Sequence, residues 1–299
     1  MNSELTVMSL FETILKWVTP FFRGRYTERY GRTLACRAVR LSFKRVISVF
    51  NLSMLFALTA LLTNCNSNSA PNCFQNSGEL LRDEVVVPDF TKITVFENVR
   101  LILKEGAQQK VEVETGEFLR NDVTAVVEGD RLLVRDSNSC NFVRDYGTTT
   151  VYITSPIISE IRSSTGLSIR SEGVLNYTNL TLISESFLNP ESETTDGAFD
   201  LELDLENLNI IVNGITYFKL RGAVMNFNVQ IAAGDSRIES ENLAAQMVSI
   251  DHRGTNDILI NPRQSLTGVI RGTGDVISSN RPPEVRVEEL FNGRLIFRE

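Results

Sequence analysis

Four evenly spaced glycines near the C-terminal end constrain the fold more than any other feature of the chain. They lie twenty residues apart, each beside a short strand-like run, at Gly214, Gly234, Gly254 and Gly274. A fixed period of this length is typical of a solenoid, in which each repeat is a coil that cannot bury its apolar side alone. Stacked β-coils bring the apolar positions together in a continuous core. The sequence therefore predicts a β-solenoid with an extended outer surface.

The apolar positions follow the glycines only in part. Ile238 and Ile258 lie four residues after their glycines, but Ser278 takes the same place in the last repeat. In the second repeat the apolar residues are one position out of step, which predicts a β-bulge or slack at Ala232-Ala233. The alternative is an antiparallel β-sandwich, because strands that recur about every 8–12 residues give a hairpin period near twenty.

Residues 1–64 differ in charge from the rest of the 299-residue chain. They hold nine Lys and Arg against three Glu, whereas the remainder holds 21 basic and 34 acidic residues. Phosphate binding needs a basic face, so the acidic remainder argues against nucleic acid as a partner. We interpret residues 1–64 as a leader with an export signal and favour residues 1–39 as an over-extended start. If that extension is real, its apolar residues fit one face of a short helix that ends at Pro20.

The export signal lies between Arg40 and Cys65. Basic residues precede an apolar stretch at 46–62, and Leu62-Thr-Asn-Cys65 follows. Leu three residues before Cys resembles the lipobox of bacterial lipoproteins, and by that resemblance Cys65 becomes the lipid-modified N-terminus. Two acyl chains suffice for a stable anchor. The alternative is an uncleaved membrane helix, for which this stretch is short.

The segment after Cys65 is polar and ends near a second cysteine. We interpret residues 65–83 as a lipid-anchored tether, since residues 66–72 are Asn, Ser, Ala and Pro. Cys73 and Cys140 remain in the exported part, and an even pair in an oxidising compartment predicts a disulfide. In the chain-entropy model this bond would contribute about 4 kcal/mol. Two free thiols, or an absent partner, are the alternatives.

Residues 84–299 are expected to form one all-β domain. Alternating patterns and turn signals predict strands in its N-terminal part, a helical turn at 117–121, and coils that begin at Ile158. A polar loop is expected at Asn189–Asp196, and Asn292-Gly293 predicts a closing hairpin at 285–298 that covers the last coil. The predicted strands are Glu84–Val87, Lys92–Phe96, Arg100–Lys104, Lys110–Glu114, Thr124–Glu128, Arg131–Arg135 and Thr149–Thr154.

From Glu84 onward the chain resembles the head GIN domain family of putative autotransporter adhesins. The residues that carry the resemblance are Phe90–Ile93, Lys104–Val113, Asn138–Arg144 and Val151–Pro156, followed by the glycine-headed repeats. The resemblance extends over nearly all of the exported part. It implies a β-solenoid, a cell-envelope lipoprotein or secreted protein, and an adhesive role.

The sequence offers little that would support catalysis, a metal or a cofactor. His252 is the only histidine, and no Gly-x-Ser-x-Gly elbow accompanies it. Asp235, Asp257 and Asp275 follow their glycines at unequal distances, which indicates turn chemistry rather than a calcium ladder. Cys-x-x-Cys pairs and clustered histidines are missing, so we predict no metal site, no cofactor and no catalytic residue.

These patterns favour a non-enzymatic lipoprotein of the bacterial cell envelope. We expect an outer-membrane anchor, facing either the periplasm or the cell surface, and binding or adhesion to a glycan or protein through the solenoid surface. Two alternatives stay open. One is a carbohydrate-active solenoid enzyme, because such enzymes set carboxylates on one coil face, and the other is a regulatory scaffold of the envelope.

Overall fold

The computed structural model describes residues 75–138, 147–187 and 194–298, together with Cys73, Cys140, Phe142, Asp145 and Ser192. The chain divides into two units, Met1–Thr63 and Asn64–Glu299, and all described residues belong to the second. The leader, Cys65 and half of the loop at Asn189–Asp196 lie outside the described residues, so the expectations for them stay predictions. Within the described ranges, no helix has the length and apolar character needed to cross a membrane.

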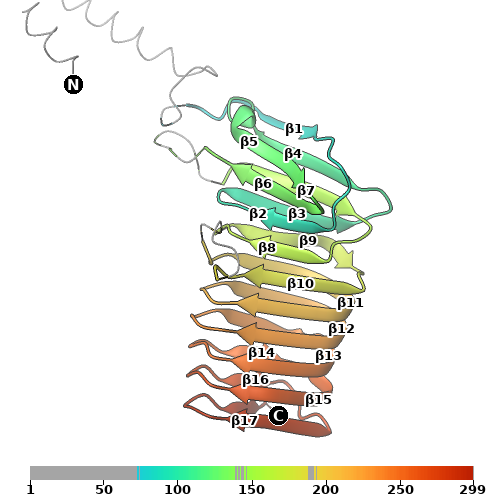
Figure 1. Ribbon diagram of the computed structural model, residues 1–299, viewed down its shortest axis with the longest axis vertical. Coiled ribbons are helices and arrows are strands. Elements are labelled where there is room, and N and C mark those ends of the chain that lie inside the picture. The colour runs from blue at the N-terminus through green and yellow to red at the C-terminus, as the bar shows by residue number, and fades with distance from the viewer. Residues whose placement is uncertain are drawn as a thin grey trace, which may run out of the picture. The chain divides into compact units, whose positions relative to one another are not determined.

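The described part of the chain is all-β (Figure 1). Eighteen strands form one mixed, curled sheet, and the helical content of the described ranges is a single 3-10 turn, η4 (Arg120–Asp122). The first nine strands are β1 (Leu80–Glu84), β2 (Lys92–Val95), β3 (Val99–Glu105), β4 (Lys110–Gly116), β5 (Val123–Glu128), β6 (Arg131–Asp136), β7 (Thr149–Ser155), β8 (Glu160–Ser163) and β9 (Ser168–Leu175). The others are β10 (Asn179–Ser184), β11 (Ala198–Val212), β12 (Tyr217–Ile231), β13 (Arg237–His252), β14 (Ile258–Ile260), β15 (Pro262–Ile270), β16 (Val276–Ser278), β17 (Glu284–Glu289) and β18 (Leu295–Phe297).

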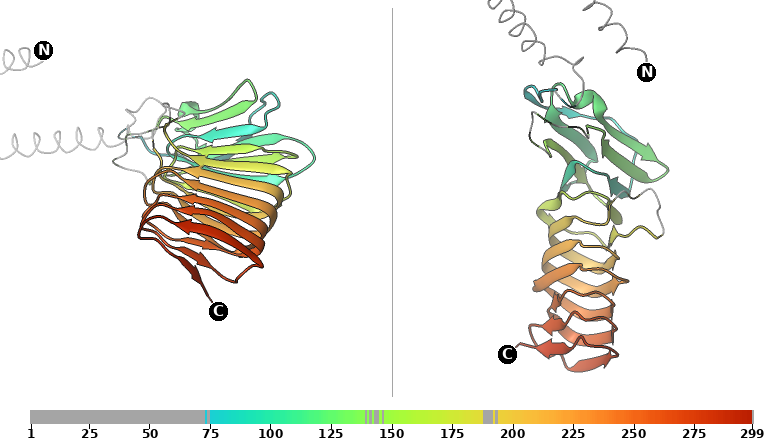
Figure 2. Two further views of the ribbon diagram at one scale, coloured as in Figure 1. Left: turned by 60° about the horizontal axis from the view of Figure 1, so that its bottom comes forward. Right: turned by 90° about the vertical axis from the view of Figure 1, so that its left-hand side faces the viewer.

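From β8 onward the strands lie in two columns, which we call limb A and limb B (Figure 2). Limb A contains β8, β10, the C-terminal halves of β11, β12 and β13, and then β15 and β17. Limb B contains β9, the N-terminal halves of β11, β12 and β13, and then β14, β16 and β18. Every one of these pairings is parallel, so the strands do not form the hairpins of the alternative antiparallel sandwich.

The interior between the limbs is built by alternation within the strand segments of each limb, and the alternation shifts where β11, β12 and β13 pass from limb B to limb A. Outward side chains alternate with inward ones because successive Cβ atoms of a strand point to opposite faces. On limb A the inward residues Leu208, Phe227 and Val248 pair in register and are fully buried. On limb B the rings of Phe199 and Phe218 stack with centroids 4.9 Å apart. Each such side chain stabilises the fold by about 1.5–3 kcal/mol through burial.

From β11 onward the repeat length varies between 17 and 21 residues, and this variation replaces the bulge expected at Ala232-Ala233. β11 and β12 pair with an offset of 19 residues throughout, as in Phe199 with Phe218. The offset between β12 and β13 is 20 at Lys219 and 21 from Arg221 onward. The irregularity therefore lies between those two residues, and Ala232-Ala233 belongs to a bend. Gln230 does not interrupt the core, because it faces outward between inward neighbours.

The N-terminal strands belong to the same stack, contrary to the expectation that coils begin only at Ile158. β2 pairs in parallel with both β6 and β8, and β3 pairs in parallel with both β7 and β9. β2 therefore lies between β6 and β8, and β3 lies between β7 and β9, although all four of these neighbours come later in the sequence. Antiparallel strands complete this end, since β4 pairs with β7 and β1, and β5 pairs with β6. The strand expected at Glu84–Val87 lies earlier, at Leu80–Glu84.

The C-terminal end is not the closing hairpin expected at 285–298. β17 pairs in parallel with β15 on limb A, and β18 pairs in parallel with β16 on limb B. Asn292-Gly293 is part of the bend that joins them, so these residues add another layer to the stack. Glu289 takes the inward position that Ile270 holds in the layer before. An inward charge at an edge strand disfavours the addition of another strand.

Candidate functional site

The predicted repeat glycines lie at the bends that join limb A to limb B. The Gly214 carbonyl accepts the amide of Asp235 at 2.9 Å, the Gly234 carbonyl accepts that of Thr255 at 2.9 Å, and the Gly254 carbonyl accepts that of Gly274 at 3.2 Å. Successive bends are therefore joined by backbone hydrogen bonds, and the four glycines follow one another along the stack.

Close backbone approach explains why glycine occupies these bends. A Cβ on Gly274 would lie 2.0 Å from the carbonyl oxygen of Asn256. A Cβ on Gly234 would lie 2.2 Å from the Gly214 oxygen, and Gly234 also has a φ of +90°, which other residues rarely adopt. These glycines serve the backbone of the stack and present no side chain to a ligand.

Cys73 and Cys140 are joined at the N-terminal end of the stack. Cys73 and Cys140 form a disulfide with an S–S distance of 2.08 Å. The Phe142 amide also donates to the Cys73 carbonyl at 2.9 Å. The segment that precedes the domain is therefore attached to the loop after β6. Cys65, the predicted site of lipidation, lies outside the described residues.

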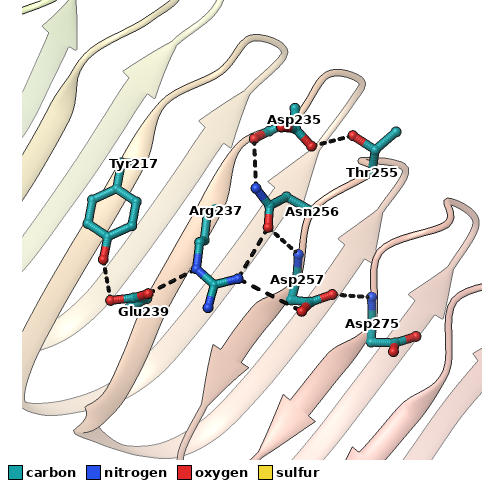
Figure 3. Close-up of polar contacts among 8 residues, drawn as sticks. All are labelled: Tyr217, Asp235, Arg237, Glu239, Thr255, Asn256, Asp257 and Asp275. Carbon is teal, nitrogen blue, oxygen red and sulfur yellow. Dashed lines mark hydrogen bonds and ion pairs between the residues drawn. The ribbon is translucent and has the colours of Figure 1, made fainter.

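Polar side chains at the bends of β12 and β13 form the network drawn in Figure 3. The Tyr217 hydroxyl donates to Glu239, and Arg237 Nε donates to the same carboxylate at 2.9 Å. Arg237 Nη1 then donates to Asn256 Oδ1 at 3.2 Å and lies 3.8 Å from Asp257. The network thus connects a limb B strand with the next bend.

The electrostatics of this network favour an ionised glutamate. The hydrogen bond from Tyr217 and then that from Arg237 lower the pKa of Glu239. The same bond to Glu239, followed by burial, raises the pKa of Tyr217 to about 12. A carboxylate that already accepts two donors is a poor general base, because its lone pairs are occupied and its proton affinity is reduced.

The bend aspartates hydrogen-bond to the next bend along the stack, which differs from the turn chemistry that the sequence predicts. Asp257 Oδ1 accepts the backbone amide of Asp275 at 3.1 Å, and Asp275 Oδ1 accepts that of Arg294 at 2.8 Å. Asp235 accepts the Thr255 hydroxyl at 2.5 Å. Within the described part of the chain, no three His, Cys, Asp or Glu side chains are grouped as a metal site would require.

His252 lies in the interior and not on a surface. It is fully buried at the end of β13, where its Nδ1 accepts the Gly254 amide at 3.3 Å. Burial lowers the pKa of the imidazole, so the neutral form is favoured. An interior position keeps this side chain away from any large substrate.

The outer face of limb A carries a row of amide and hydroxyl side chains. Thr181, Asn209, Asn228 and Ser249 pair in register across four neighbouring strand segments. Asn228 Nδ2 donates to Asn209 Oδ1 at 3.0 Å, and Asn209 Nδ2 lies 3.4 Å from the Thr181 hydroxyl. A second ladder beside it joins Asn226, Asn207 and Asn179 with bonds of 2.8 and 2.7 Å.

A groove of about 430 Å³ lies along the first of these ladders, and we call it the amide groove. Its polar lining is almost uncharged. The lining residues are Thr181, Asn209, Ile210, Ile211, Asn228, Val229, Gln230, Ser249, Ile250 and Asp251. The carboxylate of Asp251 forms ion pairs with Arg271 at 3.4 Å and with Arg253 at 3.7 Å.

The sequence contains a signal for the amide groove that the glycine spacing conceals. Asn207-Leu-Asn209 and Asn226-Phe-Asn228 repeat after 19 residues, and Asn179-Leu-Thr181 precedes them with the same pattern. A search at the fixed period of twenty misses this repeat. The repeated Asn-x-Asn pattern in neighbouring strands would have indicated a ladder on one face.

Comparison with known proteins gives both a family and a fold. The sequence matches the family described as "Putative auto-transporter adhesin, head GIN domain" over residues 89–282. A crystal structure of a putative adhesin from Bacteroides fragilis NCTC 9343 is similar, with 21% identity, a TM-score of 0.65, and coverage of 74% of this chain and 97% of that one. A putative lipid binding protein from Parabacteroides distasonis ATCC 8503 has 16% identity and a TM-score of 0.50, covering 74% and 98%. No protein of curated function matches the sequence.

The family match and the fold agree with each other. The match extends over well more than half of the chain and includes the strands β2 to β16. The segments on which the resemblance was noted, Phe90–Ile93, Lys104–Val113 and Val151–Pro156, lie inside it and contribute to β2, β3, β4 and β7. The chain therefore belongs to the head GIN domain family of putative auto-transporter adhesins.

Proposed function

We propose that the stack is a β-solenoid and that the protein is a lipid-anchored binding protein of the bacterial cell envelope, which acts in adhesion through the outer faces of the stack. The observation that carries this proposal is the repetition of outward side chains in register from one strand to the next. Thr181, Asn209, Asn228 and Ser249 form such a row. Surfaces of this kind are the extended binding platforms that repeat proteins use.

The position of the disulfide supports an anchor at one end of the stack. Cys73 follows the predicted lipid acceptor Cys65 by eight residues and is bonded to Cys140 beside the N-terminal strands. A tether entering there would leave both outer faces and the far end at β17 and β18 away from the membrane. Localisation to the outer membrane, with the domain facing either the periplasm or the cell surface, belongs to the same proposal.

Lipid labelling with an alkyne-modified fatty acid tests the anchor. Cys65→Ser should lose the label and move from the membrane to the soluble fraction of the envelope. The matched control Cys36→Ser should keep both the label and the membrane fraction, because Cys36 lies upstream of the predicted processing site. Equal labelling of the two variants, or a protein that stays in the cytosol, would refute the lipoprotein proposal.

An adhesion assay tests the binding role. Beads coated with the purified protein should adhere to intact cells or isolated envelopes more than beads coated with the heat-unfolded protein. Turnover of envelope glycans by the purified protein would instead favour the carbohydrate-active alternative. Recovery of one discrete protein partner would favour a regulatory scaffold.

A further inference from the structure

We infer that the amide groove binds an uncharged polysaccharide chain that lies along the stack, across the strands of limb A. This inference rests on the proposed binding function and names the ligand class for it. The groove extends over β10 to β13, and its volume of about 430 Å³ suits a few sugar units rather than a protein domain.

The chemistry of the lining matches a polyhydroxylated ligand. Side-chain amides and hydroxyls each offer donors and acceptors, and a sugar hydroxyl is both. Asn209, Asn228, Gln230 and Ser249 supply these groups along the groove. The lining contains no Lys, Arg or His, and its single carboxylate lies beside two arginines outside the lining, Arg253 and Arg271. A polyanion or a polycation would therefore find no row of countercharges among the lining residues.

Hydrogen-bonding capacity in the groove is left unused by the protein itself. Asn228 donates to Asn209, but among the described residues its Oδ1 accepts no hydrogen bond. Gln230 is exposed and its amide forms no hydrogen bond within the described ranges. These groups face solvent in adjacent outward positions of β12. They are the ones that a ligand hydroxyl would satisfy.

The groove floor adds an apolar component. Ile211 is only partly buried, and it lies in the outward row of Gln230 and Asp251. Sugar rings carry C–H faces as well as hydroxyls, and ligand sites commonly combine an apolar floor with a few polar groups. A folded protein partner would be expected to bury aromatic or arginine anchors, and the lining has neither an aromatic nor an arginine.

The repetition of the ladder favours a polymer over a single sugar. Equivalent side chains recur at the strand spacing of about 4.8 Å, so consecutive units of an extended chain meet the same kind of group. Weak contacts on successive strands then add through effective concentration. The outer face of limb B lacks this property, because its side chains form ion pairs such as Arg221 with Asp200 at 2.5 Å.

Affinity electrophoresis of the purified full-length chain in detergent tests the inference. Native gels contain mannan, dextran or xylan as neutral polymers, polygalacturonate as a polyanion, or gelatin as a protein. We expect at least one neutral polymer to retard the protein and the other two classes to leave its mobility unchanged. Asn228→Asp and Gln230→Ala should each weaken the retarding affinity about tenfold, the effect of one or two lost hydrogen bonds in a binding site.

The matched control is Asn226→Asp, on the same strand and in the neighbouring ladder but outside the groove lining. It makes the same chemical change and should leave retardation unchanged, while circular dichroism checks that all variants are folded. Absence of retardation by every neutral polymer would overturn the inference. Retardation that Asn226→Asp weakens as much as Asn228→Asp would also overturn it. Beads that still adhere to envelopes in that case would leave the proposed function standing, so the two failures are distinguishable.

Discussion

The two outer faces of the stack share one backbone repeat but use it in opposite ways. On limb B, Asp200, Lys219 and Glu239 lie in register with alternating charge, and arginines pair with both acidic residues. On limb A, the equivalent row consists of Thr181, Asn209 and Asn228. A charged ladder satisfies itself, whereas an amide ladder keeps donors and acceptors for a ligand. The backbone repeat therefore fixes the spacing of the surface groups, and the outward side chains determine whether those groups are charged or neutral.

The largest effect is expected from the interior that both faces share. Phe218→Ala should destabilise the fold by about 4 kcal/mol, the loss typical of a deleted buried ring. Phe227→Ala, on the limb A side, should cost about the same, because both rings are fully buried. Chemical denaturation measures both. A cost confined to one variant would mean that the two limbs do not depend equally on a common core.

The next largest loss of stability is expected when a buried ion pair is broken, in contrast to the exposed pairs of limb B. Arg162 Nη1 lies 2.8 Å from Glu185, with side chains 9% and 4% exposed, on the limb A side of the stack. Arg162→Ala should cost about 3 kcal/mol, since it leaves a carboxylate buried without this partner. Arg162→Met preserves the volume and should cost the same if charge matters more than packing. A loss below 1 kcal/mol in denaturation would contradict this.

A pH effect is expected from the interior and not from either face. Burial lowers the pKa of His252, so the unfolded chain takes up a proton below about pH 6.5 that the folded chain resists. Stability should be full above that pH and should fall as the pH drops, by up to about 1.4 kcal/mol per unit. In melting curves recorded at a series of pH values, His252→Gln should reduce the loss of stability below about pH 6.5. If the variant loses stability with falling pH as steeply as the unchanged protein, a group other than His252 causes the acid sensitivity.

The smallest effect concerns the exposed charges of limb B. Arg221→Ala removes the pair with Asp200, whose side chains are 41% and 35% exposed. Water and salt screen such pairs, so the loss should stay below about 1 kcal/mol and shrink further in high salt. Melting curves at low and high salt measure it. A loss comparable to that of Arg162→Ala would erase the contrast between the two faces.

The sequence predicts local structure well where alternation and turn residues are clear. Six of the seven strands expected before Ile158 lie within a few residues of the observed ones, and the glycines lie at bends. Partner choice is harder, because parallel pairing joins segments that no local signal connects. Nothing in residues 92–105 indicates that this segment inserts between β6–β7 and β8–β9.

Two failures have a common physical cause, which is that a local pattern has more than one three-dimensional use. Asn292-Gly293 is typical of a hairpin turn, yet Gly293 donates to Gly272 at 3.0 Å in the same series of bends as the repeat glycines. In the sequence, each of the asparagine pairs at 207–209 and 226–228 is by itself indistinguishable from the ordinary outward polar residues of a strand. Only the 19-residue offset of β11 and β12 brings them into ladders that border a groove.

The interleaved N-terminal strands determine when the domain can become complete. β3 needs β9 as a neighbour, and the two are separated by more than sixty residues of chain. A chain that emerges with its N-terminus first cannot finish this end until Leu175 is available, even though β2 and β3 are synthesised early. Contacts of such high sequence separation slow folding and leave strand edges exposed in the meantime. β2 and β3 therefore keep unpaired edges until β8 and β9 have been synthesised, and these edges need protection from aggregation during that time.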